Sequence, residues 1–381
     1  MGDTGEQRQR HRRLTAWHRA EKVLSRSSSN HTLAERLAAL AADAGTVHDL
    51  GEWTDTYGGG VVAEVERRTA NLLDMEDAAF FPTGTMAQQV ALRCWAGRTG
   101  NPVVALHPLS HPEVHERDAL GSVSGLRTAH PTSEPRLPTA EEVRDLPEPF
   151  GTLMLELPLR DAGFVLPAWE ELEAVVAAAR DRDAVVHLDG ARLWECGPHL
   201  GRSLPEITAL ADSVYVSFYK SLDGLSGAAL AGPATLVEEA RTWRHRYGGQ
   251  LYQQYPAALS ALLGLERELP RLPSYVEHAK LVAGTLAEGF AGSGMPWSRV
   301  YPAPPHTHQF QVWLPYATEV LDEASLRLAE ETGVALFGLW SRAPAGPPGV
   351  SVTEVTVASA GLEWTAGDVR DAVAGFVERL T

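Results

Sequence analysis

Cysteine, lysine and long apolar stretches are scarce in this sequence. Its two cysteines, Cys94 and Cys196, cannot build a disulfide framework, and their spacing is not that of a zinc site. A formal net charge of −16 disfavours nucleic acid and anionic membranes as partners. No stretch reaches the roughly 20 apolar residues of a membrane-spanning helix, and the basic N-terminal segment lacks the apolar core of a signal peptide. We therefore expect a cytoplasmic protein that holds no metal ion.

Lysine occurs only three times, at Lys22, Lys220 and Lys280, against 30 arginines. Lys22 and Lys280 lie in charged, helix-like segments and are expected to face solvent. Lys220 instead follows an apolar, strand-like run and precedes a loop rich in Gly and Ser. An amine that is desolvated at such a place loses affinity for its proton and becomes a usable nucleophile. Lys220 is therefore a candidate functional residue.

The length of the chain and its composition indicate more than one domain. With 381 residues, 44% of them hydrophobic and 22% charged, the chain is typical of a soluble globular protein with one large and one smaller domain. The polar residues 1–30 are expected to form an arm that is partly disordered or lies on another subunit. Residues 31–265 are expected to form the large domain and residues 266–381 the smaller one. A capping box of Thr32 and Glu35 predicts the first helix after the arm.

Short apolar runs alternate with helical segments through the middle of the chain. Strands are expected at residues 102–107, 152–157, 184–188, 213–218 and 227–231, with a helix at residues 168–180. This alternation predicts an α/β fold with a mostly parallel sheet. The strand-like and helical runs after residue 300 predict an α+β carboxyl-terminal domain.

Two of the expected strands end at ionisable residues. Asp189 follows the run of residues 185–188, and Lys220 follows the run of residues 213–218. Pyridoxal phosphate (PLP) needs a lysine for its Schiff base, an acid that keeps its pyridine nitrogen protonated, and backbone N–H groups that hold its phosphate. The pairing of Lys220 with Asp189 therefore favours PLP as the cofactor.

A phosphate site of the required kind is expected earlier in the chain, where the apolar run of residues 78–81 meets Pro82 and then a helix. Gly84 allows the backbone to close around an anion. The amides of Gly84, Thr85 and Met86, together with the Thr85 hydroxyl, are expected to face the phosphate at the start of the helix. The motif by itself is weak, because most such turns only cap a helix.

These segments together resemble the threonine aldolase and β-eliminating lyase group of fold-type-I PLP-dependent enzymes. The resemblance implies a PLP-binding large domain with the aminotransferase-like fold and a smaller carboxyl-terminal domain. The motifs that carry this resemblance are specific to the group only in combination. They lie at residues 56–92, 110–116, 155–167, 187–195, 213–232 and 243–249.

The resemblance also implies roles for individual residues. Lys220 would bind the cofactor, Asp189 would pair with its pyridine nitrogen, and His111 would stack on its ring. His115, four residues later, would then point away if the segment is helical. Arg192 remains available to contact the cofactor or a substrate carboxylate, since its guanidinium suits a bidentate contact.

Further residues are implied in the cofactor and substrate sites. Glu156 and Ser217 are expected at the cofactor, and Tyr57 and Tyr252 at the substrate. In the family, the tyrosine of the loop that contains Tyr57 lies near the active site, often across a dimer interface. A homodimer or homotetramer is therefore expected, with a small amino acid as the substrate.

Three features depart from the family pattern. Leu157, Pro158 and Leu159 follow Glu156 where the common aldolases have Asn-Thr-His. The last strand lacks the arginine that helps bind the substrate carboxylate, and Thr353 occupies its place; Tyr252 replaces a second arginine. The apolar triplet favours a larger, less polar β-substituent, so phenylserine-like substrates are expected to compete well with threonine.

The expected reaction is retro-aldol cleavage of a β-hydroxy-α-amino acid to glycine and an aldehyde. His111, directly or through a water, is the candidate that assists removal of the hydroxyl proton. The same scaffold would permit β-elimination or racemisation, and the sequence does not distinguish these reactions. A binding protein that has lost catalysis is the remaining alternative, which the presence of Lys220, Asp189 and His111 disfavours.

Overall fold

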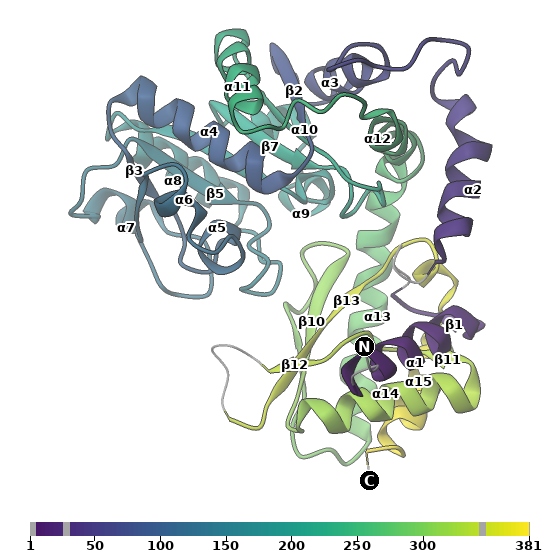
Figure 1. Ribbon diagram of the computed structural model, residues 1–381. Helices are drawn as coiled ribbons and strands as arrows, with labels where there is room; N and C mark the ends of the chain where they lie inside the picture. The colour runs from purple at the N-terminus through teal and green to yellow at the C-terminus, as the bar shows by residue number, and fades with distance from the viewer. Residues whose placement is uncertain (1–4, 26–30, 343–347, 381) are drawn as a thin grey trace. The chain divides into compact units, whose positions relative to one another are not determined.

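The computed structural model describes residues 5–25, 31–342 and 348–380, which form two compact units (Figure 1). The large unit is Ala39–Arg271, and the small unit combines Met1–Ala38 with Leu272–Thr381. The described part of the expected N-terminal arm forms helix α1 (Gly5–Arg19) and strand β1 (Lys22–Val23) within the small unit.

The large unit is built on a seven-stranded sheet in the order β2-β8-β7-β6-β5-β3-β4. Only β8 runs antiparallel to its neighbours among the described strands, so the prediction of a mostly parallel sheet is confirmed. The strands are β2 (Asp77–Phe81), β3 (Val103–Ala105), β4 (Arg127–Ala129), β5 (Thr152–Glu156), β6 (Val185–Gly190), β7 (Ser213–Ser217) and β8 (Ala228–Gly232).

Helix α4 (Gly84–Thr99) packs on the centre of this sheet and, with α11 (Ala234–Arg246), shares an apolar cluster with β2, β7 and β8. Cys94 of α4 lies in this cluster, and burial raises the pKa of its thiol to about 12. The other helices of the unit are α3 (Gly60–Leu72), α5 (His111–His115), α6 (Ala119–Ser122), α7 (Ala140–Asp145), α8 (Trp169–Arg180), α9 (Gly197–Leu200), α10 (Leu204–Thr208) and α12 (Tyr255–Arg267).

Helix α2 (Leu33–Asp43) begins at the capping box that the sequence predicts. The Thr32 N–H donates to Glu35 Oε2 at 2.6 Å, and the Glu35 N–H donates to Thr32 Oγ1 at 3.3 Å. None of the residues of α2 is buried. The local signal therefore fixes where this helix starts, whereas packing within the chain contributes little to it.

The small unit contains the antiparallel sheet β12-β13-β10-β9 and a two-stranded parallel pair, β1 with β11 (Val334–Ala335). Its core joins Phe290, Phe337, Trp340 and Phe376, whose rings contact one another. The remaining elements are α13 (Leu272–Gly292), β9 (Arg299–Tyr301), β10 (Gln309–Leu314), α14 (Thr318–Thr332), β12 (Ser341–Arg342), β13 (Ser351–Thr356) and α15 (Ala366–Val377). In the described ranges of both units, every helix is too short or too polar to cross a bilayer.

Gly227, in the turn before β8, is required by both its backbone and its neighbours. Its φ is +101°, and a β-carbon there would collide with the ring of Phe80. We predict that Gly227→Ala lowers the free energy of unfolding by about 2 to 4 kcal/mol, because it combines backbone strain with overpacking.

Gly97 of α4 provides the matched control, since a β-carbon there would meet no atom within 4 Å. Gly97→Ala should be neutral or raise stability by up to about 1 kcal/mol through helix propensity. Urea unfolding followed by circular dichroism measures both variants. Equal stability of Gly227→Ala and the wild type would contradict the prediction.

Candidate active site

Four ionisable side chains lie where neighbouring strands of the large unit end. They are His111 at the start of α5, Glu156 at the end of β5, Asp189 near the end of β6 and Lys220 just after β7. Glu156 is in register with Asp189, which is in register with Tyr215 of β7. Because β3, β5, β6 and β7 are adjacent and parallel, their carboxyl ends form one edge of the sheet, where such folds bind ligands. The fold thus brings Lys220, Asp189 and His111 to the same edge.

Asp189 presents a buried carboxylate that is only half satisfied. Its side chain is 1% exposed, and Oδ1 accepts the Ala191 N–H at 3.1 Å. Oδ2 is buried and has no hydrogen-bond partner among the described residues. Burial raises the pKa of Asp189, and the charge of Lys220 opposes this rise. A buried oxygen of this kind is costly unless a donor meets it, so the site suits a ligand with a cationic N–H group.

Lys220 is half-buried, and its amine is easier to deprotonate than an ordinary lysine. Burial, followed by the Arg192 guanidinium, lowers the pKa of Lys220 to about 8, although Asp189 and Glu156 pull it upward. Among the described residues, no carboxylate lies within 4 Å of its amine. The position therefore provides a nucleophilic amine near neutral pH.

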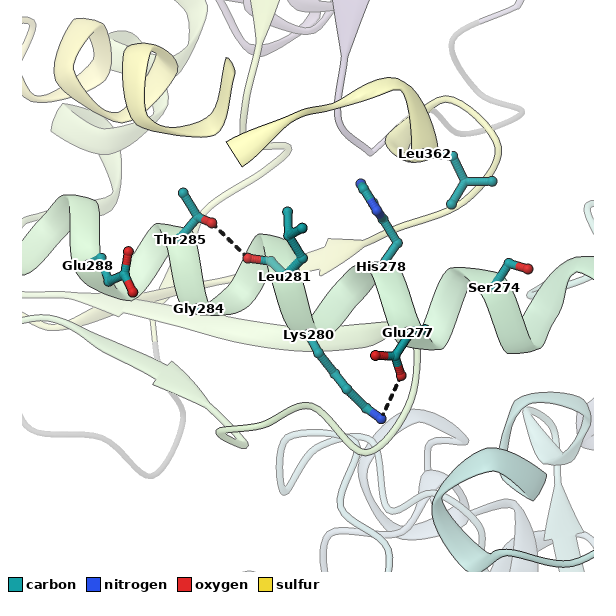
Figure 2. Close-up of a pocket in the computed structure, with 9 residues that line it drawn as sticks. All are labelled: Ser274, Glu277, His278, Lys280, Leu281, Gly284, Thr285, Glu288 and Leu362. Carbon is teal, nitrogen blue, oxygen red and sulfur yellow. Dashed lines mark hydrogen bonds and ion pairs between the residues drawn. The ribbon is translucent and has the colours of Figure 1, made fainter. Parts of the chain in front are cut away.

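The other two lysines have carboxylate partners, both in the small unit. Lys22 Nζ lies 2.6 Å from Asp368 Oδ1. Lys280 Nζ lies 3.0 Å from Glu277 Oε2 on α13, where Figure 2 shows the pair on the wall of a surface groove of about 800 Å³. Both amines therefore differ from Lys220 in having a carboxylate within 4 Å.

His111 is held by two glutamates. Its backbone N–H donates to Glu156 Oε2 at 2.7 Å, and its ring Nδ1 lies 3.1 Å from Glu116 Oε1. Glu116 has a fully buried side chain, whose other oxygen accepts from Gln89 of α4 at 3.1 Å. The carboxylate fixes Nδ1 as the protonated nitrogen and sets the ring orientation. Sequence reasoning missed Glu116 and Gln89 as site residues, although Glu116 stands five residues after His111.

Glu156 ties two segments to the end of β5. Besides the His111 N–H, it accepts the Arg160 N–H at 3.2 Å. Burial and the carboxylate of Asp189 raise the pKa of Glu156 to about 7. Glu156 therefore positions backbone on either side of the edge, and the cofactor contact expected from the sequence stays a prediction.

Helix α4 begins at the expected phosphate site. A β-carbon on Gly84 would overlap the Tyr215 hydroxyl, so only glycine fits there. The Met86 N–H donates to Thr83 Oγ1 at 3.2 Å and is therefore already paired. The N–H groups of Gly84 and Thr85 find no acceptor within the described chain, which leaves two of the three expected amides for an anion.

Ser217 and Arg192 contribute further polar atoms without partners. Ser217 Oγ, at the end of β7, is buried and forms no hydrogen bond with any described residue. Arg192 follows Asp189 by three residues, stacks at 5.3 Å over Phe164, and has a buried Nε that is unpaired within the described residues. Its effect on the pKa of Lys220 places its charge near that amine.

Tyr57 and Tyr252 contact each other rather than the four ionisable residues at the sheet edge. Their ring centroids lie 5.4 Å apart, and the Tyr57 N–H donates to the Tyr252 carbonyl at 2.9 Å. Both side chains are more than half exposed. The structure records no hydrogen bond or ring contact between this pair and His111, Asp189 or Lys220 in the described ranges.

The rings of His111 and His115 lie side by side, and the expectation that His115 points away from the cofactor stays a prediction. The two ring centroids are 5.3 Å apart, because residues four apart in a helix share a face. His115 Nε2 lies 2.6 Å from Asp161 Oδ2 and 3.3 Å from Arg160 Nη1. A second histidine and its charged neighbours therefore adjoin the first.

The sheet order and the lysine that follows β7 define the class of this protein. Its fold is that of the fold-type-I PLP-dependent enzymes, with a small antiparallel-sheet unit. The chain belongs to the beta-eliminating lyase family, whose sequence profile matches residues 29–297.

Individual relatives agree with this assignment. The chain is 26% identical over 283 residues to low-specificity L-threonine aldolase 1 of Arabidopsis thaliana, covering 72% of this chain and 77% of that protein. A Listeria monocytogenes structure described as a candidate L-allo-threonine aldolase has a TM-score of 0.86 and 34% identity, covering 97% of this chain and 99% of that one. An Exiguobacterium structure described as a candidate aromatic amino acid beta-eliminating lyase/threonine aldolase has a TM-score of 0.86 and 35% identity over the same shares.

The lowered pKa of Lys220 is directly testable, because the chain has only three lysines. At a pKa of about 8, roughly one amine in four is neutral at pH 7.5, against about one in a thousand at the ordinary value. We predict that limiting acetic anhydride at pH 7.5 acetylates Lys220 of cofactor-free protein at least about tenfold faster than Lys22 or Lys280. Peptide mass spectrometry measures the three rates.

Arg192→Met is the control for the cause of this shift. Removing the guanidinium should raise the pKa of Lys220 and slow its acetylation at pH 7.5, while leaving the other two lysines unchanged. Equal labelling of all three lysines in the wild type would contradict a depressed pKa.

Proposed function

We propose that this chain is a PLP-dependent aldolase that cleaves β-hydroxy-α-amino acids, including threonine, to glycine and an aldehyde. The observation that carries the proposal is the buried, unpartnered Asp189 Oδ2 on the strand next to the half-buried, weakly basic Lys220. The relatives named as threonine aldolases support the same reaction class.

The residues at the sheet edge fit PLP. Lys220 would bind its aldehyde carbon, and Asp189 Oδ2 would accept from its pyridine N–H. The Gly84 and Thr85 amides would hold its phosphate, and His111 would lie against its ring. Bound there, PLP supplies an electron sink for the pair that Cα keeps when its bond to Cβ breaks.

The chain's own groups then bind and orient the substrate. Arg192 has a buried guanidinium nitrogen without a partner, so it is the proposed site for the substrate carboxylate. The amine of Lys220 has a pKa of about 8, so it can hold or release a proton at Nζ near neutral pH. Glu116 and Glu156 keep His111 in one orientation throughout.

Residues 157–159, which stand where the family has a polar triplet, supply no polar side chain to the edge of the sheet that carries Lys220 and Asp189. Leu157 and Leu159 are 0% and 1% exposed, and Pro158 is buried with them. An edge without these polar groups favours a less polar β-substituent, which supports phenylserine-like substrates beside threonine.

A substrate panel tests the reaction. We predict aldehyde and glycine from threonine, allo-threonine and phenylserine, with a kcat/KM for phenylserine at least equal to that for threonine. Lys220→Ala should lose turnover by about 1000-fold or more and should carry no cofactor mass after borohydride reduction.

Serine, cysteine and alanine provide the opposing outcomes in the same assay. Pyruvate from serine or cysteine, without aldehyde from any substrate, would replace the proposal with β-elimination. Loss of optical activity in alanine without aldehyde would replace it with racemisation. A cofactor spectrum unchanged by every amino acid would indicate a binding protein.

We also propose that the chain forms a homodimer or a dimer of dimers through an exposed apolar patch of the large unit. Two segments form the patch, joined by a hydrogen bond from Gln253 Nε2 to Thr54 Oγ1 at 2.8 Å. Trp53 in this patch is 96% exposed, which a monomer in water would not favour. The patch consists of Leu50, Trp53, Tyr57, Leu251 and Tyr252.

Trp53→Glu tests this surface. A charge in the patch should weaken self-association at least about tenfold, because it would be buried without a partner in the oligomer. Sedimentation velocity at micromolar concentration measures the change. Val123→Glu, at a 55% exposed residue outside the patch, is the control and should leave association unchanged. A wild-type monomer with full activity would contradict the proposal.

A further inference from the structure

A histidine, a carboxylate and a guanidinium form a compact cluster beside His111. His115 Nε2 lies 2.6 Å from Asp161 Oδ2. Arg160 Nη1 lies 3.3 Å from the same nitrogen and 3.6 Å from Asp161 Oδ1. The cluster joins the end of α5 to the segment after β5, where the apolar triplet has removed the polar groups of the common aldolases.

The same carboxylate that positions His111 also positions this cluster. Glu156 accepts the backbone N–H groups of both His111 and Arg160. The Arg160 guanidinium contributes to lowering the pKa of Lys220, so its charge lies within electrostatic reach of that amine. The cluster therefore belongs to the same edge of the sheet as Lys220.

The two histidines differ in the atoms that they leave available. His111 is engaged at its Nδ1 by Glu116, which leaves its Nε2 lone pair, on a ring that is expected to lie against the cofactor. In His115, the carboxylate of Asp161 accepts from Nε2–H, which leaves the Nδ1 lone pair as a base. The His115 side chain is 37% exposed, so a substrate can reach it.

We propose that His115 is the catalytic residue that takes the proton of the substrate's β-hydroxyl. Asp161 is a positioning residue that fixes its tautomer and orientation, and Arg160 is a positioning residue whose charge holds the Asp161 carboxylate in place. This inference rests on the aldolase function proposed above and assigns to His115 the proton transfer that the sequence suggested for His111. The ring of His111 is left to pack against the cofactor.

The step balances without an added oxidant or reductant. His115 Nδ1 takes the hydroxyl proton, the O–H electron pair forms the carbonyl bond of the aldehyde, and the Cα–Cβ bond breaks with its electron pair left on Cα. Cα then takes a proton to give glycine, and His115 releases its own proton to water. His115 is therefore needed only for substrates that carry a β-hydroxyl.

A reaction that involves no β-hydroxyl can therefore distinguish the role of His115 from that of Lys220 and the cofactor. Exchange of the glycine Cα proton in deuterated water needs the cofactor and Lys220 but no base at a β-hydroxyl. We expect His115→Asn and His115→Gln to lower kcat for phenylserine and threonine cleavage by about 100-fold or more, with glycine exchange within about threefold of wild type. Nuclear magnetic resonance measures exchange, and an aldehyde assay measures cleavage.

Asp161→Asn tests the positioning role. It should lower kcat for cleavage about tenfold with little change in KM, again with glycine exchange preserved, and Asp161→Glu should restore part of the loss. His130→Asn is the matched control, because His130 also pairs with a carboxylate, Glu113, at 3.6 Å but lies outside the cluster. It should leave both rates unchanged.

Two outcomes would overturn the inference while leaving the aldolase proposal intact. One is wild-type cleavage by both His115 variants; the other is equal loss of cleavage and exchange, which would indicate a role in cofactor binding or folding. If the wild type releases no aldehyde from any β-hydroxy amino acid, the proposed function itself fails.

Discussion

The electrostatic balance among Asp189, Glu156 and Lys220 is the constraint on which the rest of the site depends. Burial raises the pKa of both acids and lowers the pKa of the amine, so it disfavours the charged form of each group. The opposite charge of the neighbouring group acts against this effect. Glu156 satisfies its oxygens with backbone N–H groups, whereas Asp189 leaves Oδ2 without a partner in the described chain. A cationic donor at Asp189 would relieve that cost, and the position of this carboxylate is fixed because β6 is central in the sheet.

Glu156 links this electrostatic balance to the geometry of the edge. One carboxylate holds the start of α5 and the backbone after β5, so His111 and Arg160 are positioned together. The side chain is 8% exposed, and removing it would leave two backbone N–H groups without their acceptor. A single buried carboxylate thus determines where two other residues of the edge are placed.

Local patterns predicted much of this architecture. Apolar runs ending at Asp189 and Lys220 indicated strand ends, and alternation with helices indicated a parallel sheet, because both signals lie within a few residues. Gln89 was missed because 27 residues separate it from Glu116, the partner of His111, and only the packing of α4 brings the two together. The contact between the rings of His111 and His115 follows from helix geometry, because residues four apart in a helix share a face. The fold was more predictable than the site for this reason: site contacts join distant segments.

The departure from the family pattern also follows from this geometry. Replacing a polar triplet with Leu157, Pro158 and Leu159 turns that segment into buried core, so the polar groups of the edge must come from elsewhere. Arg160 and Asp161 come directly afterwards and meet His115 from α5, a helix already held by Glu156. The charged cluster therefore stands one residue beyond the lost polar groups and is held by the same carboxylate. Charged side chains thus reach the edge directly after the apolar triplet, because Glu156 fixes the backbone of Arg160 and the start of the helix that carries His115.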